Sequence, residues 1–188
     1  NGICITDHYT EGYFSGLEGS WNKKADTFLT GYHNAVFASK NIDFQVVLGM
    51  ELRLASSSNE NLIYGITEEF LYLNPELYKL DLHSLSSLVK KEGFLMYQAH
   101  PFRKGMSPAE PSFLHGIEVY NGNPRHNSRN DEAYDFAVKN GLNMISGSDC
   151  HEICDVARGG IIIKNQISAY DELIRIIKNN DFELIKTI

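Results

Sequence analysis

The sequence predicts an α/β protein formed by one domain over residues 1–188. Short apolar runs alternate with longer stretches of helical spacing, which is typical of βα units and a largely parallel sheet. Hydrophobic residues make up 43% of the chain and charged residues 22%, a balance that suits a globular domain with a core. No linker or change of composition divides the chain, so we expect a single domain.

The apolar runs expected to form strands are rich in Ile, Val and Leu. They are residues 3–6, 44–54, 62–66, 94–98, 116–120, 143–145, 160–163 and 182–185. The stretches expected to form helices repeat apolar residues at a spacing of three and four. They are residues 21–40, a segment from an Asp81 cap to Gly93, residues 131–139, and a last helix capped by Ser168.

The overall charge, the cysteines and the apolar segments disfavour a DNA-duplex-binding protein, a disulfide-rich protein and a membrane protein. Acidic residues outnumber basic ones, 24 against 17, for a net charge of −7, whereas duplex binding needs a basic face. The three cysteines do not make a disulfide framework, and no apolar segment reaches the ~18 residues of a membrane span. Cys150 and Cys154 flank His151, but ordinary thiols are favoured over a zinc clip because no second Cys/His pair has suitable spacing. We expect a cytoplasmic protein without a membrane partner.

Residues of metal-ligand type recur where the apolar runs stop. A single histidine at a strand end is more often structural, but a series in sequence order is hard to ascribe to chance. All strand carboxyl ends lie on one face of a parallel α/β barrel, so these side chains would converge on one mouth. Imidazoles mixed with carboxylates suit Zn²⁺, Mn²⁺ or Fe²⁺. The residues are His8, Glu51, His100, Glu118, Asp149 and His151.

Four short motifs contain most of these residues: Ile5-Thr6-Asp7-His8, Gly49-Met50-Glu51, Ala99-His100-Pro101 and Gly147-Ser148-Asp149-Cys150-His151. In this order they resemble the successive motifs of the PHP (polymerase and histidinol phosphatase) superfamily. Each motif alone is weak, but their order is specific, and the resemblance covers most of the chain. It implies a distorted (β/α)7 barrel, two or three divalent metal ions (Zn, Mn or Fe), and phosphoester hydrolysis by a metal-bound hydroxide.

The resemblance also implies how the ligands are shared. His8 and His151 would bind one metal, and Glu51 would bridge two others. His100 would bind one of these two and Asp149 the other, so that Glu51, His100 and Asp149 form the catalytic centre. Residues expected to orient these ligands from outside the metal shell are Asp7, Glu118 and Asn121.

The sequence departs from the family pattern in its metal ligands. The opening His-x-His pair and a further His or Asp ligand after it are absent, and Leu62 stands where another family histidine is expected. We therefore expect an N-terminally incomplete barrel that lacks its first βα unit, which is about 30 residues long. Each metal keeps few of its ligands, so we expect the metals to be depleted.

A phosphorylated substrate needs cationic donors, and Arg is the natural bidentate one. Arg103 lies three residues past a candidate ligand and is the best placed, with a plain surface arginine as the equal alternative. Arg125, His126 and Arg158 could also reach the mouth, although solvated loop residues are the more common outcome. Tyr9 is expected to line the same mouth.

The expected activity is metal-dependent hydrolysis of a phosphomonoester such as histidinol phosphate, a sugar phosphate or a nucleotide. An alternative within the family is a phosphodiesterase of the 3′–5′ exonuclease kind, which the acidic charge disfavours. An alternative of another class is a non-catalytic PHP-like binding module. The sequence contains no Gly-x-Ser-x-Gly elbow, Gly-rich phosphate loop or dinucleotide-binding fingerprint that would indicate a different chemistry.

Overall fold

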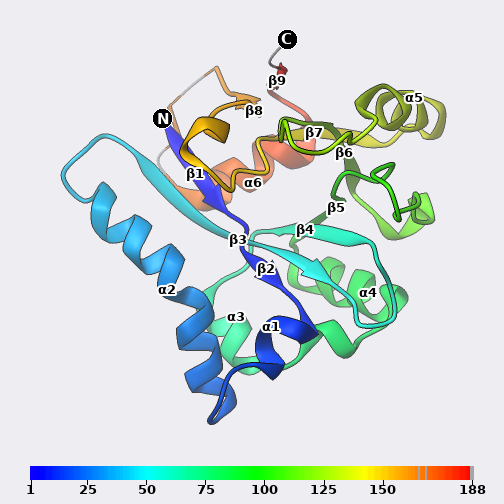
Figure 1. The fold of residues 1–188 in the computed structure, drawn as a ribbon. Helices are drawn as coiled ribbons and strands as arrows, with labels where there is room; N and C mark the ends of the chain where they lie inside the picture. The colour runs from blue at the N-terminus through cyan, green and yellow to red at the C-terminus, as the bar shows by residue number, and fades with distance from the viewer. Residues whose placement is uncertain (165, 168, 187–188) are drawn as a thin grey trace. The chain divides into compact units, whose positions relative to one another are not determined.

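The computed structural model describes residues 1–164, 166–167 and 169–186. The chain forms two compact units, unit 1 (Asn1–Phe94) and unit 2 (Leu95–Ile188). Each unit combines strands with helices, so the α/β class is confirmed (Figure 1). A single domain over the whole chain stays a prediction.

Unit 1 is built around the strand β3 (Gln45–Arg53). β1 (Gly2–Ile5) and β2 (His8–Tyr9) pair in parallel with successive parts of β3, and β4 (Glu60–Tyr64) pairs with it antiparallel. The helices are α1 (Glu11–Ser15), α2 (Trp21–Ser39), α3 (Glu68–Leu73) and α4 (Leu82–Glu92), with a 3-10 turn η1 (Leu77–Lys79).

The antiparallel pairing of β3 and β4 corrects the expectation of parallel βα units in this part of the chain. Residues 54–59 join the two strands, and this segment is too short for the crossover helix that parallel neighbours require. Ser56, Ser57, Ser58 and Asn59 supply the turn chemistry of a hairpin instead. The hairpin places Glu60 on the strand beside Glu51.

Aromatic rings form the core below the sheet of unit 1. Tyr9 is completely buried, and its ring centroid lies 4.6 Å from that of Phe14 and 5.4 Å from that of Phe28. The Tyr9 hydroxyl accepts a hydrogen bond from the Leu77 backbone N–H at 3.3 Å. The expectation that Tyr9 lines a mouth is therefore wrong, because alternation along β2 turns it to the face opposite its exposed neighbour His8.

Unit 2 contains three parallel strands followed by a separate two-stranded sheet. β5 (Leu95–Gln98), β6 (Gly116–Asn121) and β7 (Asn143–Gly147) pair in that order, and α5 (Asn130–Asn140) packs on β6. β8 (Gly159–Ile162) and β9 (Glu183–Lys186) form the antiparallel pair. The remaining elements are α6 (Tyr170–Asn179) and the 3-10 turns η2 (Pro111–Phe113) and η3 (Ile153–Asp155). Ser168, expected to cap α6, lies outside the described residues.

A β-bulge interrupts the pairing of β6 with β7. Glu118 pairs with Ile145 and Tyr120 with Ser146, so that Val119 is the extra residue. Such bulges re-aim side chains and are common beside functional sites. Among the described residues, no helix has the length and apolarity needed to cross a lipid bilayer.

Candidate functional site

Unit 1 brings three residues of metal-ligand type to one face of its sheet. His8 of β2 pairs directly with Glu51 of β3, and paired residues point to the same face. Glu51 also pairs with Leu62 of β4, and Glu60 lies two residues before Leu62, so Glu60 shares this face as a diagonal neighbour. We call His8, Glu51 and Glu60 the unit 1 ligand group. Glu51 lies inside β3, not at its end as expected.

The unit 1 ligand group is close-packed and mostly buried. The Nδ1 atom of His8 lies 2.9 Å from Glu51 Oε2 and 3.9 Å from Glu60 Oε1. One ligand atom from each residue can be chosen so that all lie within 4.8 Å of one another. Glu51 and Glu60 are each 7% exposed. Two buried carboxylates this close repel each other, and a nearby positive charge reduces that repulsion. The guanidinium of Arg53 lies 3.8 Å from Glu60 Oε1.

Glu60 belongs to this group but was not among the ligands predicted from the sequence. Leu62 was expected to replace a family histidine, and it is buried in β4 beside Glu51. The signal that could have found Glu60 is the serine-rich turn between two apolar runs, which predicts a hairpin. Alternation along that hairpin would have placed Glu60 on the same face as Glu51.

Asp7 follows β1 and lies next to this group. The backbone carbonyl of Asp7 accepts a hydrogen bond from the Glu51 N–H at 3.0 Å. Its carboxylate packs against Gly31 of α2, where a Cβ atom would lie 2.9 Å from Asp7 Oδ2. Partial burial there raises the pKa of Asp7, and the neighbouring His8 opposes this effect. Asp7 therefore joins the group through its backbone.

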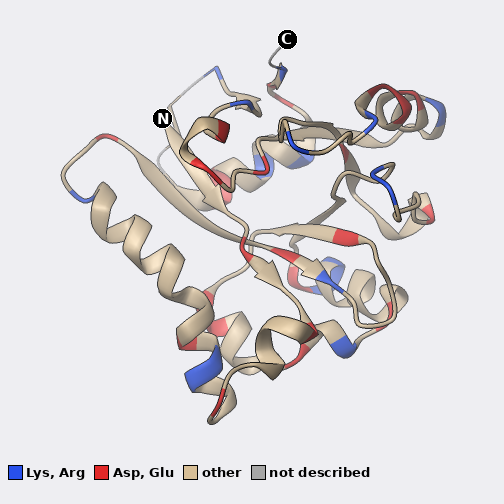
Figure 2. Ribbon diagram, viewed as in Figure 1, with Lys and Arg blue, Asp and Glu red and all other residues tan. Residues whose placement is uncertain are grey.

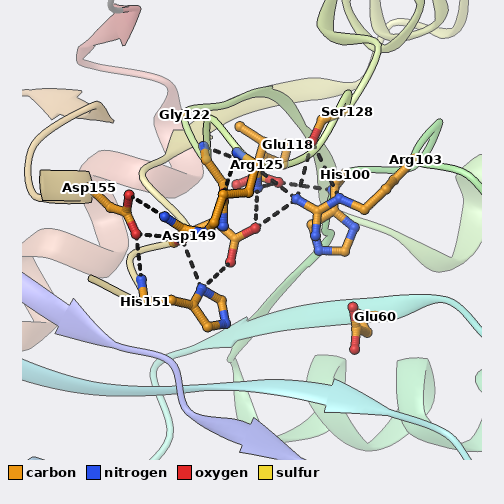
Figure 3. A network of polar contacts seen from close by, with 12 residues as sticks. Glu60, His100, Arg103, Glu118, Gly122, Arg125, Ser128, Asp149, His151 and Asp155 are labelled. Carbon is orange, nitrogen blue, oxygen red and sulfur yellow. Dashed lines mark hydrogen bonds and ion pairs between the residues drawn. The ribbon is translucent and has the colours of Figure 1, made fainter.

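Unit 2 carries a second polar network at the carboxyl ends of β5, β6 and β7 (Figure 3). Glu118 Oε2 accepts hydrogen bonds from the backbone N–H of His100 at 2.9 Å and from Asn121 Nδ2 at 3.0 Å. Asn121 Nδ2 also donates to Asp149 Oδ2 at 3.2 Å. Glu118 and Asn121 thus link the two candidate ligands. Gly147 leaves room for this link, because a Cβ there would lie 2.6 Å from Glu118 Oε1.

Arg103 lies inside the same network. Its Nη2 atom donates to Asp149 Oδ2 at 2.6 Å, to Asn121 Oδ1 at 3.0 Å and to Ser128 Oγ at 3.1 Å. The side chains of Arg103 and Asp149 are only 16% and 10% exposed, so this ion pair is shielded from solvent. Arg103 is therefore not a plain surface arginine. Its contact with a phosphate stays a prediction.

The backbone is strained at two candidate ligands. His100 has a φ of 27° and Asp149 a φ of 47°, both in the left-handed region that residues other than glycine rarely adopt. Such a conformation costs about 1–3 kcal/mol and persists where the surrounding structure enforces it. His100 lies two residues past the end of β5, and Asp149 lies two residues past the end of β7. The strained backbone at His100 and Asp149 is therefore consistent with a functional role for the direction of these two side chains.

The segment after β7 holds Asp149 and His151 close together. His151 Nδ1 lies 3.4 Å from Asp149 Oδ1 and 3.0 Å from the Asp149 carbonyl oxygen. Across the described residues, however, His100, Asp149 and His151 do not form a group with all ligand atoms within 4.8 Å. Asp149 is engaged by Arg103 instead. That these residues and the unit 1 ligand group share one rim stays a prediction.

Two of the other cationic candidates of unit 2, Arg125 and Arg158, contact the protein itself. Arg125 forms two hydrogen bonds with the carboxylate of Asp155, and this guanidinium holds the pKa of Asp155 well below its usual range. Arg158 Nε donates to the Gly122 carbonyl at 3.0 Å, and His126 is exposed. Roles toward substrate stay predictions for all three.

Comparisons with known proteins relate the chain to other sequences and folds. The family described as PHP-associated matches residues 127–182. An uncharacterized protein of Methanocaldococcus jannaschii, MJ0417, is 30% identical over 150 residues, which is 71% of this chain and 61% of that protein. The chain therefore spans less than two thirds of this relative.

Solved structures with low sequence identity have a similar fold. PsfC from Pseudomonas syringae superposes with a TM-score of 0.66 at 15% identity, covering 92% of this chain and 72% of PsfC. A two-domain protein from Bacteroides vulgatus, described as containing a predicted PHP-like metal-dependent phosphoesterase, superposes with a TM-score of 0.63 at 17% identity. That match covers 100% of this chain and 56% of the Bacteroides protein.

Proposed function

We propose that this chain, which belongs to the PHP superfamily, forms part of a metal-dependent phosphoesterase. The observation that carries the proposal is the unit 1 ligand group, in which His8, Glu51 and Glu60 bring their ligand atoms within 4.8 Å. The (β/α)7 barrel that the resemblance implies is our proposal for the fold of the whole protein. The substrate that we propose is a small phosphomonoester.

The unit 1 ligand group fits a divalent cation. One imidazole and two carboxylates form the mixed donor set that suits Zn²⁺, Mn²⁺ or Fe²⁺. A bound cation would offset the mutual repulsion of the two buried carboxylates. A divalent cation in a phosphoesterase lowers the pKa of a coordinated water and neutralises charge on phosphoryl oxygens. The role of His8, Glu51 and Glu60 in the proposal is to hold it.

The residues of unit 2 would bind and orient the phosphate end of the substrate. Arg103 presents a planar guanidinium, the natural bidentate partner of a phosphoryl group. Asn121 and Asp149 fix the position of this guanidinium through the contacts at 3.0 Å and 2.6 Å. Glu118 fixes the backbone of His100, which would provide a further ligand. Asp and Glu occur along both units, interspersed with Lys and Arg, which favours a small substrate over a nucleic acid (Figure 2).

A substrate panel tests the proposed activity. Purified protein in Mn²⁺ or Zn²⁺ should release phosphate from phosphomonoesters such as sugar phosphates, nucleotides or histidinol phosphate, and EDTA should stop the release. Faster turnover of phosphodiesters or of single-stranded DNA ends would favour the exonuclease activity. Metal binding without turnover of any of these would favour a non-catalytic binding module.

Replacing His100 or Asp149 by Ala is expected to lower the amount of metal that the protein retains. Each side chain is a candidate ligand two residues past the end of a parallel strand, and its strained backbone indicates an enforced position. Elemental analysis after gel filtration measures the bound metal, and circular dichroism confirms the fold. His33→Ala is the matched control, because His33 is an exposed histidine paired with Glu68 on helices of unit 1. Unchanged metal in both variants would remove His100 and Asp149 from the site.

A further inference from the structure

Asp155 is an unusual aspartate, because it is completely buried in a loop. Its Oδ1 atom accepts a hydrogen bond from Arg125 Nη1 at 3.0 Å. Its Oδ2 atom accepts from Arg125 Nη2 at 2.5 Å, from the His151 N–H at 2.9 Å and from the Glu152 N–H at 2.8 Å. Aspartates are almost never buried this fully unless they are paired. Asp155 therefore joins one arginine to the backbone of a candidate ligand (Figure 3).

The loop formed by residues 149–158, which we call the ligand loop, has little apolar packing to hold it. All of its residues are described, and Asp155 is the only buried one among them. Ile153 is 94% exposed and Val156 59% exposed, so apolar packing does not anchor the loop. Asp149 and Ala157 both have a positive φ, at 47° and 62°, which the loop must enforce against strain. Polar contacts have to supply the anchoring.

Besides the ion pair between Arg103 and Asp149 at 2.6 Å, these contacts come from one neighbouring segment, residues 121–130. Asn123 Nδ2 donates to the Asp149 carbonyl at 3.0 Å, at the start of the ligand loop. Arg125 binds Asp155 in its middle, and Arg158 at its end donates to the Gly122 carbonyl at 3.0 Å. The contact between Arg125 and Asp155 is bidentate, and the same Asp155 carboxylate accepts the hydrogen bond from the His151 N–H.

We infer that Arg125 and Asp155 form a clamp that positions Asp149 and His151 for metal binding. This inference rests on the proposed function. According to this inference, Arg125 does not contact the substrate but positions the ligand loop. Asp155 is a positioning residue too, because its carboxylate accepts hydrogen bonds from the Arg125 guanidinium and from the two backbone N–H groups. Partners that orient metal ligands in this way typically change metal affinity by about 10–100-fold when they are removed.

Asp155→Asn is the main test, because it breaks the bidentate ion pair without removing any cationic donor that a substrate could use. Arg125→Gln is the second variant, and it removes the arginine partner of the same ion pair. Arg175→Gln is the control, since Arg175 is an exposed residue of α6 that pairs with Glu172 at 3.9 Å. Mn²⁺ is the probe: residue-resolved NMR broadening at the Asp149 and His151 amides measures its affinity for the ligand loop. Amide hydrogen exchange at His151 and Glu152 measures how firmly the loop is held.

Both clamp variants are expected to raise the Kd for Mn²⁺ at the ligand loop by about tenfold or more. Both should also accelerate exchange at His151 and Glu152, while the folded core keeps its exchange rates. The double variant should be no worse than Asp155→Asn alone, because the two residues act as one unit. Mn²⁺ affinity or amide exchange that matches the control protein would overturn the clamp.

Failure of the proposed function has a different signature. If the unchanged protein shows no Mn²⁺-dependent broadening at any candidate ligand, the metal-dependent activity is wrong whatever the variants do. The clamp is then judged on amide exchange alone. Unchanged exchange at His151 and Glu152 in Asp155→Asn would still reject it.

Discussion

Replacing Glu51 by Gln is expected to abolish cation binding at the unit 1 ligand group and to lower kcat/KM for phosphoester hydrolysis by about 10³-fold, or about 4 kcal/mol of transition-state stabilisation. Glu51 lies between the other two members, 2.9 Å from His8 and on the same sheet face as Glu60. The amide has the size of the carboxylate but lacks its negative charge. Steady-state kinetics in Mn²⁺ and isothermal titration calorimetry measure the two effects.

Glu68→Gln is the matched control for this experiment. Glu68 also pairs with a histidine, His33, at 3.0 Å, but both side chains are more than 40% exposed and stand on helices. We expect this variant to keep its metal affinity and its activity, since exposed pairs contribute little. Glu51→Gln should fold as the unchanged protein does in EDTA. Wild-type metal affinity in Glu51→Gln would contradict the proposed site.

Replacing Gly116 by Ala is expected to destabilise unit 2 by more than about 3 kcal/mol, beyond the usual cost of overpacking. Gly116 lies in β6 and pairs with Tyr97 of β5 and Asn143 of β7. A Cβ atom there would lie 2.2 Å from the Asn143 carbonyl oxygen and 2.4 Å from a ring carbon of Tyr97. The backbone of a paired strand cannot give way as a flexible side chain can. Urea unfolding followed by circular dichroism measures the loss.

Gly12→Ala is the control for the second prediction. Gly12 is a helical residue of α1, and a Cβ atom there would meet only Thr10 Oγ1, at 3.9 Å. Alanine is favoured over glycine inside a helix by about 1 kcal/mol, so this variant should be neutral or more stable. Equal stability of the Gly116→Ala protein and the unchanged protein would mean that β5, β6 and β7 do not pair as described.

Most strands and the long helices could be predicted from the sequence, because their apolar periodicity is strong. The run at residues 44–54 is β3, and the helix expected at residues 21–40 is α2. Short elements escaped, since β2, α1 and α3 are too brief to show a period. The direction of β4 escaped as well. The prediction of βα units requires a helical crossover between neighbouring parallel strands. The segment between β3 and β4 contains only a turn, so these strands are antiparallel.

The candidate site was predicted in part for a related physical reason. His8 and Glu51 could be chosen by residue type, and the pairing of β2 with β3 does bring them together. Glu60 was missed because its place depends on strand direction, which residue type does not report. Tyr9 was misplaced because a two-residue strand gives no alternation to read. The partners of Arg125 and Arg158 could not be predicted, because loop contacts depend on tertiary structure.

Anomalous diffraction from crystals grown with Mn²⁺ is the decisive test of the metal site, because it locates bound cations without reference to activity. We expect a manganese peak bound by His8, Glu51 and Glu60, with metal–ligand distances of roughly 2.0–2.4 Å. We also expect a peak at Asp149 and His151 in unit 2. Ordered crystals without a peak at either group, with Glu51 and Glu60 bound only to protein atoms, would rule out the proposed metal sites.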